Sequence, residues 1–361
     1  MTTASMESVS EKCVQIEVSV APLICGLPDD IALLCLARVP RRYHHVLRCV
    51  SKRWRDLLCS EEWLSCRRKN NLEETWIYVV ARDKSNGNCC FVLDLDPARR
   101  CWKILQVIRS PCLAKHGFCV EALGKKLYVL GGCTWQIDAM DEVHCYDASK
   151  NKWEIAASMP TARCYFVSAS LNNKLYVTSG HGSNSDSPNS WNIYDSSSSC
   201  WSSLKNPMLT PDIVKFIALD GKLYTIHRTW NGLLFAGVYD PSCSRWQGMK
   251  NEIALCSCGP TVVVDGTLYM LDETKGTKLM MWQKESEDWV ALGRLSHELT
   301  RPPCKLLGIG RSICVIGQGL STVVIDVDKA AKVGGMLVCS SFVPNFDCAN
   351  HSVISCKTIT I

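Results

Sequence analysis

Cysteine is the chemically reactive residue that stands out in this chain, because 23 of the 361 residues are cysteine. A zinc site would need close, repeated cysteine pairs. No two cysteines stand three positions apart, and the only tight groups are Cys89-Cys90 and Cys256-Ser257-Cys258. This odd, scattered set indicates buried free thiols in a reducing compartment rather than a metal site or a disulfide framework.

The other reactive side chains do not form a catalytic set. We find no paired nucleophile and base: His44 and His45 are adjacent, and the remaining histidines are scattered. We therefore expect no catalytic residue, no cofactor and no metal. No apolar run reaches the length of about 18 residues that a membrane-spanning helix needs. The polar segment Met1–Lys12 does not resemble a secretory signal, so we expect an intracellular protein, in the cytoplasm, the nucleus or both, without a membrane partner.

The net charge of +5 is concentrated in one segment. Between Arg38 and Lys69, ten lysines and arginines stand against three acidic residues, a local excess of +7. A basic segment can bind nucleic acid. Here the basic residues fall between regularly spaced apolar ones, as on the solvent face of a helix, so we expect no nucleic-acid partner.

The elements that carry these side chains begin with two predicted helices. Leu27-Pro28-Asp29-Asp30 predicts a helix start capped by Asp29 or Asp30, and Pro40 would end that helix. A second helix is expected from Arg42 to Cys59. Helices this short bury little area alone, so a partner surface is expected. The apolar face of the second helix comprises Val46, Leu47, Val50, Trp54, Leu57 and Leu58.

The same segment resembles an F-box. The resemblance runs without gaps through Leu27-Pro28-Asp29-Asp30-Ile31, Cys35–Pro40 and Leu47–Leu57, with an unrelated amphipathic hairpin as the alternative. It implies a three-helix unit over residues 23–70 that docks on a Skp-type adaptor and through it on a cullin. Residues 1–22 would be a flexible extension. By position, Leu27, Pro28 and Ile31 would contact the adaptor, whereas Val50 and Trp54 would hold the bundle together.

Two periodic series run in phase through the rest of the chain, at steps of about 45–50 residues, which indicates a repeat architecture. One is a Leu-Tyr pair, and the other is a tryptophan that in its first four occurrences follows an acid by six residues. The pairs begin at Leu127, Leu175, Leu223 and Leu268, and the tryptophans are Trp102, Trp153, Trp201, Trp246 and Trp289, with acids at Asp96, Asp147, Asp195 and Asp240.

Each repeat is expected to form four short strands. In the second repeat these are Phe118–Leu123, Leu127–Leu130, His144–Tyr146 and Trp153–Ile155. Turn pairs such as Asp220-Gly221 suit tight hairpins. A four-stranded repeat near 50 residues is typical of a propeller blade. We predict an all-β propeller of about six degenerate blades over residues 72–361, with the periodic tryptophans packed between the blades.

Gly131-Gly132, Tyr146-Asp147, Trp153 and Met159–Arg163 resemble a kelch repeat, and later repeats depart from it. An F-box followed by kelch repeats is similar to the plant F-box/kelch family. The resemblance implies the substrate-recognition subunit of an SCF-type ubiquitin ligase, non-catalytic itself, whose propeller binds a target protein for ubiquitination. Two alternatives remain: an interaction scaffold without a degradative role, and a kelch-type copper oxidase with His181 and His227 among its ligands.

Target-binding residues are expected in the loops that follow the second strand of each repeat and in the connections between blades. Variable loops on a rigid scaffold are where recognition usually lies, and tryptophan and arginine are frequent interface anchors. The candidates are Trp135, Arg163, His181, Asn184, Trp230 and Arg301.

The first repeat lacks an innermost strand, because the polar stretch before Trp76 is a poor strand. A ring of blades must join its ends or leave an open strand edge. The β-branched segment His351–Lys357 stands near the chain end. We predict that it supplies the innermost strand of the first blade beside Trp76–Val80, and that the last blade ends with a strand near Met336–Cys339.

Overall fold

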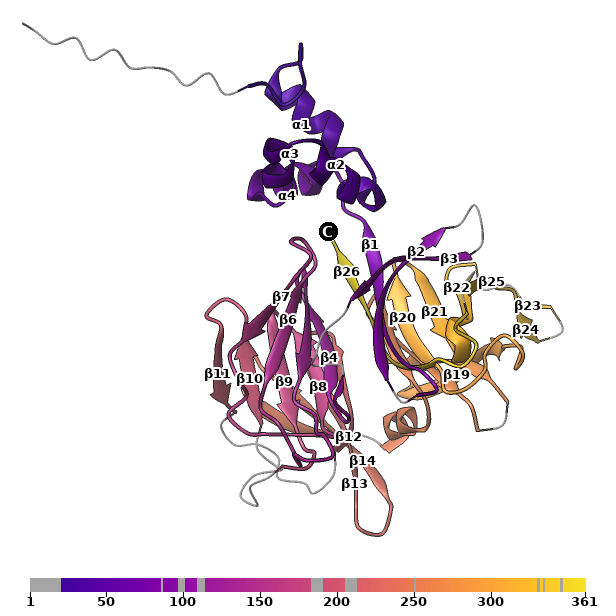
Figure 1. The fold of residues 1–361 in the computed structure, drawn as a ribbon. Helices are drawn as coiled ribbons and strands as arrows, with labels where there is room; N and C mark the ends of the chain where they lie inside the picture. The colour runs from indigo at the N-terminus through magenta and orange to yellow at the C-terminus, as the bar shows by residue number, and fades with distance from the viewer. Residues whose placement is uncertain are drawn as a thin grey trace, which may run out of the picture. The chain divides into compact units, whose positions relative to one another are not determined.

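The computed structural model describes residues 21–361 except 86, 97–100, 109–113, 183–190, 205–212, 250, 275, 330–331, 334 and 345–346. The extension expected over residues 1–22 lies outside this range, apart from its last two residues. Contacts within the chain divide it into two units, Met1–Leu72 and Glu73–Ile361. Each unit is described by itself (Figure 1).

The first unit is helical. Its elements are α1 (Asp29–Ala37), the 3-10 turn η1 (Arg41–Tyr43), α2 (His44–Val50), α3 (Lys52–Leu57) and α4 (Glu61–Lys69). The prediction of one helix from Arg42 to Cys59 is wrong. The chain is extended at Ser51, whose Oγ accepts a hydrogen bond from the backbone N–H of Trp54 at 3.1 Å and starts α3. Among the described helices, none is both long and apolar enough to cross a membrane.

A buried arginine stabilises this small bundle. Arg67 of α4 is 1% exposed and donates to the carbonyl oxygens of Ala37 at 2.7 Å and Val39 at 3.3 Å. These carbonyls lie where α1 ends, so α4 satisfies acceptors that the helix itself leaves free. Trp63 is buried beside it, with the ring of His44 at 5.3 Å. The apolar core is completed by Ala32, Leu36, Ala37, Leu57, Leu58 and Leu64.

Asp29 does not cap α1, contrary to the prediction, because no side chain bonds to the free amides of that helix. Its carboxylate accepts hydrogen bonds from the backbone N–H of Leu23 at 2.8 Å and from the guanidinium of Arg53 at 2.5 Å. The bond from Leu23, followed by that from Arg53, lowers the pKa of Asp29. Asp29 therefore ties the segment before α1 to α3.

The second unit is a propeller of six antiparallel, four-stranded blades (Figure 1). Blade 1 comprises β26 (Ser352–Thr360), β1 (Thr75–Arg82), β2 (Asn88–Asp96) and β3 (Cys101–Ile108). Blade 2 comprises β4 (Cys119–Leu123), β5 (Lys126–Leu130), β6 (Val143–Asp147) and β7 (Lys152–Ala156). Blade 3 comprises β8 (Val167–Leu171), β9 (Lys174–Thr178), β10 (Asn192–Asp195) and β11 (Cys200–Ser203).

The remaining blades follow the same order from the innermost strand outward. Blade 4 comprises β12 (Ile213–Leu219), β13 (Lys222–Arg228), β14 (Leu234–Asp240) and β15 (Arg245–Met249). Blade 5 comprises β16 (Thr261–Val264), β17 (Thr267–Asp272), β18 (Lys278–Gln283) and β19 (Asp288–Arg294). Blade 6 comprises β20 (Lys305–Ile309), β21 (Ser312–Ile316), β22 (Thr322–Asp326) and β25 (Ser340–Pro344). The 3-10 turns η3 (Asn251–Cys258) and η4 (Gln318–Leu320) lie in connections.

The periodic acids shape the turns between the third and fourth strands. The Oδ1 atom of Asp147 accepts from the backbone N–H groups of Ser149 at 2.9 Å and Lys150 at 3.1 Å. Asp195 and Asp240 accept equivalent bonds, each from the serine two residues further on. A short acid at this position supplies the acceptor that the turn backbone lacks, which explains its recurrence.

The periodic aromatic residues form a chain of ring contacts from blade to blade. Tyr128 of blade 2 meets Tyr194 of blade 3 with ring centroids 5.6 Å apart, and Tyr194 meets Trp201 of its own blade at 5.2 Å. The tryptophans were predicted to pack between blades as core residues, and Trp201 does reach the segment after blade 2, where its Nε1 donates to the carbonyl of Ala157 at 2.8 Å. The tryptophans, however, cover the outside of these contacts: Trp153 and Trp201 are only half-buried.

The ring closes as predicted. β26 pairs antiparallel with β1, from Thr75 opposite Thr360 to Arg82 opposite Ser352, so the closing strand is longer than the expected segment (Figure 1). Backbone hydrogen bonds between Glu74 and Ile361, at 2.8 and 3.0 Å, extend the pairing to the chain end. The last strand of the sequence therefore completes the first blade.

The predicted fourth strand of the last blade is wrong in position. β25, not Met336–Cys339, pairs with β22. β24 (Met336–Leu337) instead pairs with β23 (Lys332–Val333) and lies parallel to the edge of β19. β25 also runs parallel to β3, which joins blades 6 and 1 into one eight-stranded sheet.

Removal of the closing strand should open the ring. Deleting residues 352–361 exposes the hydrogen-bonding edge of β1, so we expect aggregation and loss of the cooperative thermal transition of the propeller. Size-exclusion chromatography and thermal denaturation measure both. The control Thr360→Ala keeps the backbone pairing and loses only an exposed hydrogen bond to Thr75, so it should shift stability by at most about 1 kcal/mol. A truncated chain with unchanged elution and melting would contradict the closure.

Trp191 should be among the most sensitive positions of the core. It is 1% exposed between blades 3 and 4, with the rings of Phe216 at 5.2 Å and Trp246 at 5.1 Å. Trp191→Ala should lower the free energy of unfolding by about 3–5 kcal/mol, the usual cost of truncating a buried tryptophan. Trp230→Ala, 95% exposed, should cost less than about 0.5 kcal/mol in the same urea titration. An equal loss of unfolding free energy in the two variants would refute the assignment of Trp191 to the core and Trp230 to the surface.

Candidate functional site

The first candidate surface comprises exposed apolar side chains of the F-box unit. Leu27, Pro28 and Ile31, the residues predicted to meet an adaptor, are all exposed to solvent. Tyr43, Val46 and Val50 are also at least half exposed. Several exposed apolar residues in so small a unit make it a candidate interaction site.

Val50 corrects one predicted role. It was expected to hold the bundle together, but it is 58% exposed. The break at Ser51 is the physical reason, because it changes the direction of the chain between α2 and α3. Val46 and Val50 lie four residues apart and share one face of α2. Trp54 does support the bundle: it is half-buried and its Nε1 donates to the carbonyl of Leu23 at 2.8 Å.

The second candidate surface is one face of the propeller, which we call the loop face. In an antiparallel blade, the loop after the second strand and the connection to the next blade emerge on the same side. Among the described residues, the loop face therefore carries residues 131–142, 179–182, 191 and 229–233, together with the described parts of the inter-blade connections. The opposite side, the hairpin face, carries the tight turns between first and second and between third and fourth strands.

Trp135 lies at the tip of a braced loop. Thr134 Oγ1 accepts from the backbone N–H of Ile137 at 3.1 Å, and this turn leaves Trp135 94% exposed. The base of the loop is held by Glu142, which pairs with Lys115 at 2.5 Å. That bond is the main reason that the pKa of Glu142 is lowered. Braced loops that expose an aromatic side chain are well suited to bind a protein.

Trp230 occupies the equivalent place two blades further on. It lies in the turn between β13 and β14, which is closed by a backbone hydrogen bond from Thr229 N to Leu233 O at 2.8 Å. Its side chain is 95% exposed, and Leu233 beside it is 64% exposed. His181 and Arg301 are also exposed on this face, in agreement with their expected positions. Asn184 lies outside the described residues.

Arg163 is placed differently from the expectation. It is 1% exposed, and its guanidinium donates to the carbonyl of Ser179 at 2.6 Å and to Asn192 Oδ1 at 3.1 Å. Burial lowers its pKa to about 10. The side chain turns inward because the end of β9 offers it a carbonyl acceptor. Arg163 therefore fixes blade 2 to blade 3, and we do not retain it as a target contact.

His227 is not available as a metal ligand. It belongs to β13 rather than to a loop, it is fully buried, and it bonds with Thr225 Oγ1 at 2.7 Å. Burial lowers its pKa to about 4. Within the described ranges, no three His, Cys, Asp or Glu side chains come together to hold a metal ion. The oxidase alternative therefore loses the ligand set on which it was based.

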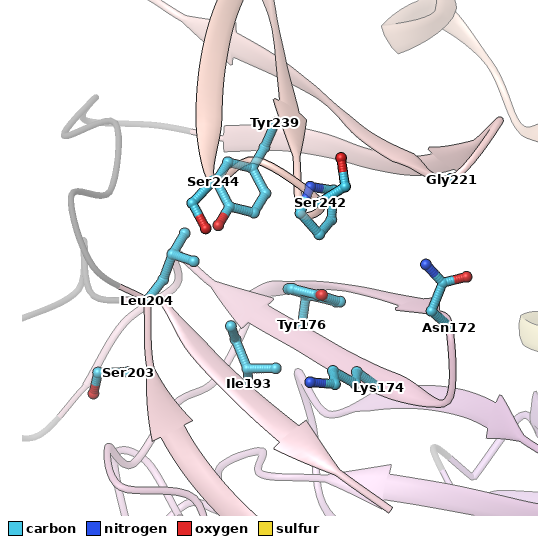
Figure 2. Close-up of a pocket in the computed structure, with 11 residues that line it drawn as sticks. Asn172, Lys174, Tyr176, Ile193, Ser203, Leu204, Gly221, Tyr239, Ser242 and Ser244 are labelled. Carbon is cyan, nitrogen blue, oxygen red and sulfur yellow. The ribbon is translucent and has the colours of Figure 1, made fainter.

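A pocket of about 390 Å³ lies between blades 3 and 4 on the hairpin face, and sequence reasoning missed it. Figure 2 shows Tyr239 and Ser244 on one side and Tyr176 on the other. In blade 2 the place of Ser244 is taken by Asn151, which accepts a hydrogen bond from the Tyr146 hydroxyl. Serine is shorter than asparagine and leaves space beside the tyrosine. This substitution between repeats is the feature of the sequence that could have indicated the pocket.

Comparison with known families agrees with this architecture. Residues 24–65 match the F-box domain, and residues 91–360 match the family described as FKB95, Kelch-repeats domain. The fold and these matches define an F-box protein with a kelch propeller. The second match covers most of the chain, and the chain belongs to the F-box/kelch-repeat family. The predicted family is thus confirmed.

Its relatives include several proteins of Arabidopsis thaliana. The chain is 42% identical to F-box/kelch-repeat protein SKIP4 over 94% of both chains. It is 35% identical to F-box/kelch-repeat protein At1g30090 over 41% of this chain and 38% of that protein. It is 31% identical to F-box protein AFR over 41% and 40%, respectively. Of these three relatives, SKIP4 alone matches this chain along nearly its full length.

Proposed function

We propose that this protein is the substrate-recognition subunit of an SCF-type ubiquitin ligase. Its F-box docks on a Skp-type adaptor, and through it on a cullin, while the loop face of the propeller binds a target protein for ubiquitination. The observation that carries the proposal is the presence, in one chain, of an F-box with an exposed apolar face and a closed kelch propeller with exposed tryptophans.

The adaptor interface is assigned to Leu27, Pro28 and Ile31, and Val46 and Val50 are also exposed in the same unit. Covering such side chains is favourable by about 25 cal/mol per Å² of apolar area. In the described part of the chain these residues are at least partly exposed at the surface of the unit. An adaptor can therefore bind without unfolding the bundle.

The proposed role of this protein is non-catalytic, and we place it inside the cell. Recognition on the loop face needs shape and charge, and ubiquitin transfer belongs to other subunits of the assembly. The cysteines whose side chains are described are free thiols. Free thiols suit a reducing compartment, which supports a place in the cytoplasm, the nucleus or both.

The adaptor interface can be tested with Leu27→Ala combined with Pro28→Ala. The change removes exposed apolar area, so capture of a Skp-type adaptor should fall at least about tenfold, the equivalent of 1.4 kcal/mol. The melting temperature of the propeller should stay the same. Glu62→Ala, an exposed residue of the same unit, is the matched control and should bind as the unmodified chain does. Undiminished adaptor capture by the double variant would remove the assignment.

The target surface can be tested with Trp135→Ala and Trp230→Ala. Each change removes an exposed aromatic anchor, so capture of target proteins in the presence of a proteasome inhibitor should fall while adaptor capture is kept. Ile155→Ala, which is 83% exposed on the outer strand β7, is the control and should capture the same targets. If the two tryptophan variants and the control capture alike, targets bind elsewhere.

A further inference from the structure

The two exposed tryptophans of the loop face have different surroundings. Trp135 is followed by three acidic residues within residues 138–142. The turn that carries Trp230, residues 228–234, contains one arginine and no acidic residue. The two tryptophans therefore meet different chemistry in a bound partner, and the acidic loop is the one whose partner can be specified.

The ring of Trp135 belongs to a connected group of rings. Its centroid lies 6.3 Å from that of His116, in an edge-to-face arrangement. The next residue, Gly117, contacts Tyr165, whose backbone N–H donates to the Gly117 carbonyl at 2.7 Å. A Cβ atom on Gly117 would lie 2.9 Å from the Tyr165 ring, so only glycine leaves room for the ring there. We call Trp135, His116 and Tyr165 the aromatic patch.

Tyr165 is exposed although its backbone is strained. Its φ angle of +51° lies in the left-handed region, which bulky residues rarely adopt. Its side chain is 64% exposed, so burial of the ring does not offset this strain. Strained positions of this kind cluster at binding sites. The conformation of Tyr165 therefore supports a binding role for the aromatic patch.

The chain around the aromatic patch carries a negative charge. It comprises residues 115–117, 133–142 and 163–165. With histidine neutral, these segments contain two basic and three acidic residues, a net charge of +2 − 3 = −1. Both basic residues are already engaged, because Lys115 pairs with Glu142 and Arg163 is buried between blades 2 and 3. Two acidic residues are left over.

These two residues are Asp138 and Asp141. Both are exposed, and within the described ranges neither carboxylate makes a hydrogen bond or an ion pair. Asp138 stands three residues after Trp135, and its carbonyl accepts from Cys164 Sγ at 3.2 Å. Because Cys164 directly precedes Tyr165, this bond holds the backbone of Asp138 close to the aromatic patch. The carboxylate of Asp138 stays available for a cation.

We propose that the aromatic patch binds a basic segment of the target protein, through an arginine side chain that lies against the rings and pairs with Asp138. Arginine combines contact with an aromatic face and a bidentate pair with a carboxylate. Exposed rings beside an unpaired carboxylate complement both properties. This inference rests on the proposed function, in which the loop face binds the target, and it adds the chemistry of the segment that is bound.

The charge preference can be tested by fluorescence polarisation with the full chain at low ionic strength. The probe is a labelled peptide of three Gly-Ser-Arg-Leu repeats, and two comparison peptides carry glutamine or glutamate in place of arginine. We expect saturable binding of the arginine peptide, at least about tenfold tighter than that of the glutamine peptide, because the second lacks the charge-assisted contact. No saturable binding, or equal binding of these two peptides, would overturn the proposal.

Substitutions then locate the site. Tyr165→Ala should weaken binding of the arginine peptide by about threefold, because a cation–π contact is lost. Asp138→Lys should weaken the arginine peptide at least about tenfold and tighten the glutamate peptide, because the charge beside the rings is reversed. Misfolding would weaken both peptides and cannot produce opposite shifts. Glu285→Lys, an exposed residue of the turn between β18 and β19, is the matched control and should change neither affinity. Equal affinities of the two lysine variants would exclude the patch.

Failure of this inference can be told apart from failure of the proposed function, because target capture and adaptor capture are measured on the same variants. If Trp135→Ala and Trp230→Ala lower target capture but Asp138→Lys leaves peptide binding unchanged, the proposed function stands and the basic segment is excluded. If the arginine peptide binds as expected to a chain that captures no adaptor, the patch stands and the ligase role is excluded.

Discussion

β26 and β1 bring residues 285 positions apart into contact, and the rest of the propeller depends on this pairing (Figure 1). An open ring would leave the edge of β1 unpaired, and unpaired edges associate with other chains. Closure also places Lys357 beside Glu121 of blade 2. The same strand therefore completes blade 1 and links it to blade 2.

Aromatic contacts join neighbouring blades at the first three junctions, from blade 1 to blade 4. Tyrosines of neighbouring blades meet, as Tyr128 and Tyr194 do, and Arg163 bridges blades 2 and 3. These contacts hold the ends of the loops and leave the tips free. Trp135 and Trp230 lie at such tips. Because their loops are already held by the scaffold, little entropy is lost by ordering the loops on binding. The tryptophans proposed for recognition therefore lie at loop tips, whereas the contacts between blades use strand and connection residues.

The sequence was sufficient for the features that repeat or are local. The blade period, the turn pairs with positive φ at Asp220 and Gly221, and the F-box all follow from spacing and residue type. It was insufficient where a residue acts through a distant partner. Arg163 looks like a surface arginine until β9 offers it a carbonyl, and Trp191 belongs to no periodic series although it is buried between two blades. Ser51 was read as part of a helix because its role as a cap depends on where the chain turns.

The central claim, that the F-box commits what the propeller holds to degradation, is tested most directly by the lifetime of proteins bound through the loop face. Their half-lives should be compared in cells that carry the unmodified chain, Leu27→Ala with Pro28→Ala, or Trp230→Ala. The account predicts that the first shortens these half-lives and that both variants restore them, one through lost adaptor binding and the other through lost target binding. Half-lives that are the same with the unmodified chain and the double variant would contradict it and indicate a scaffold without a degradative role.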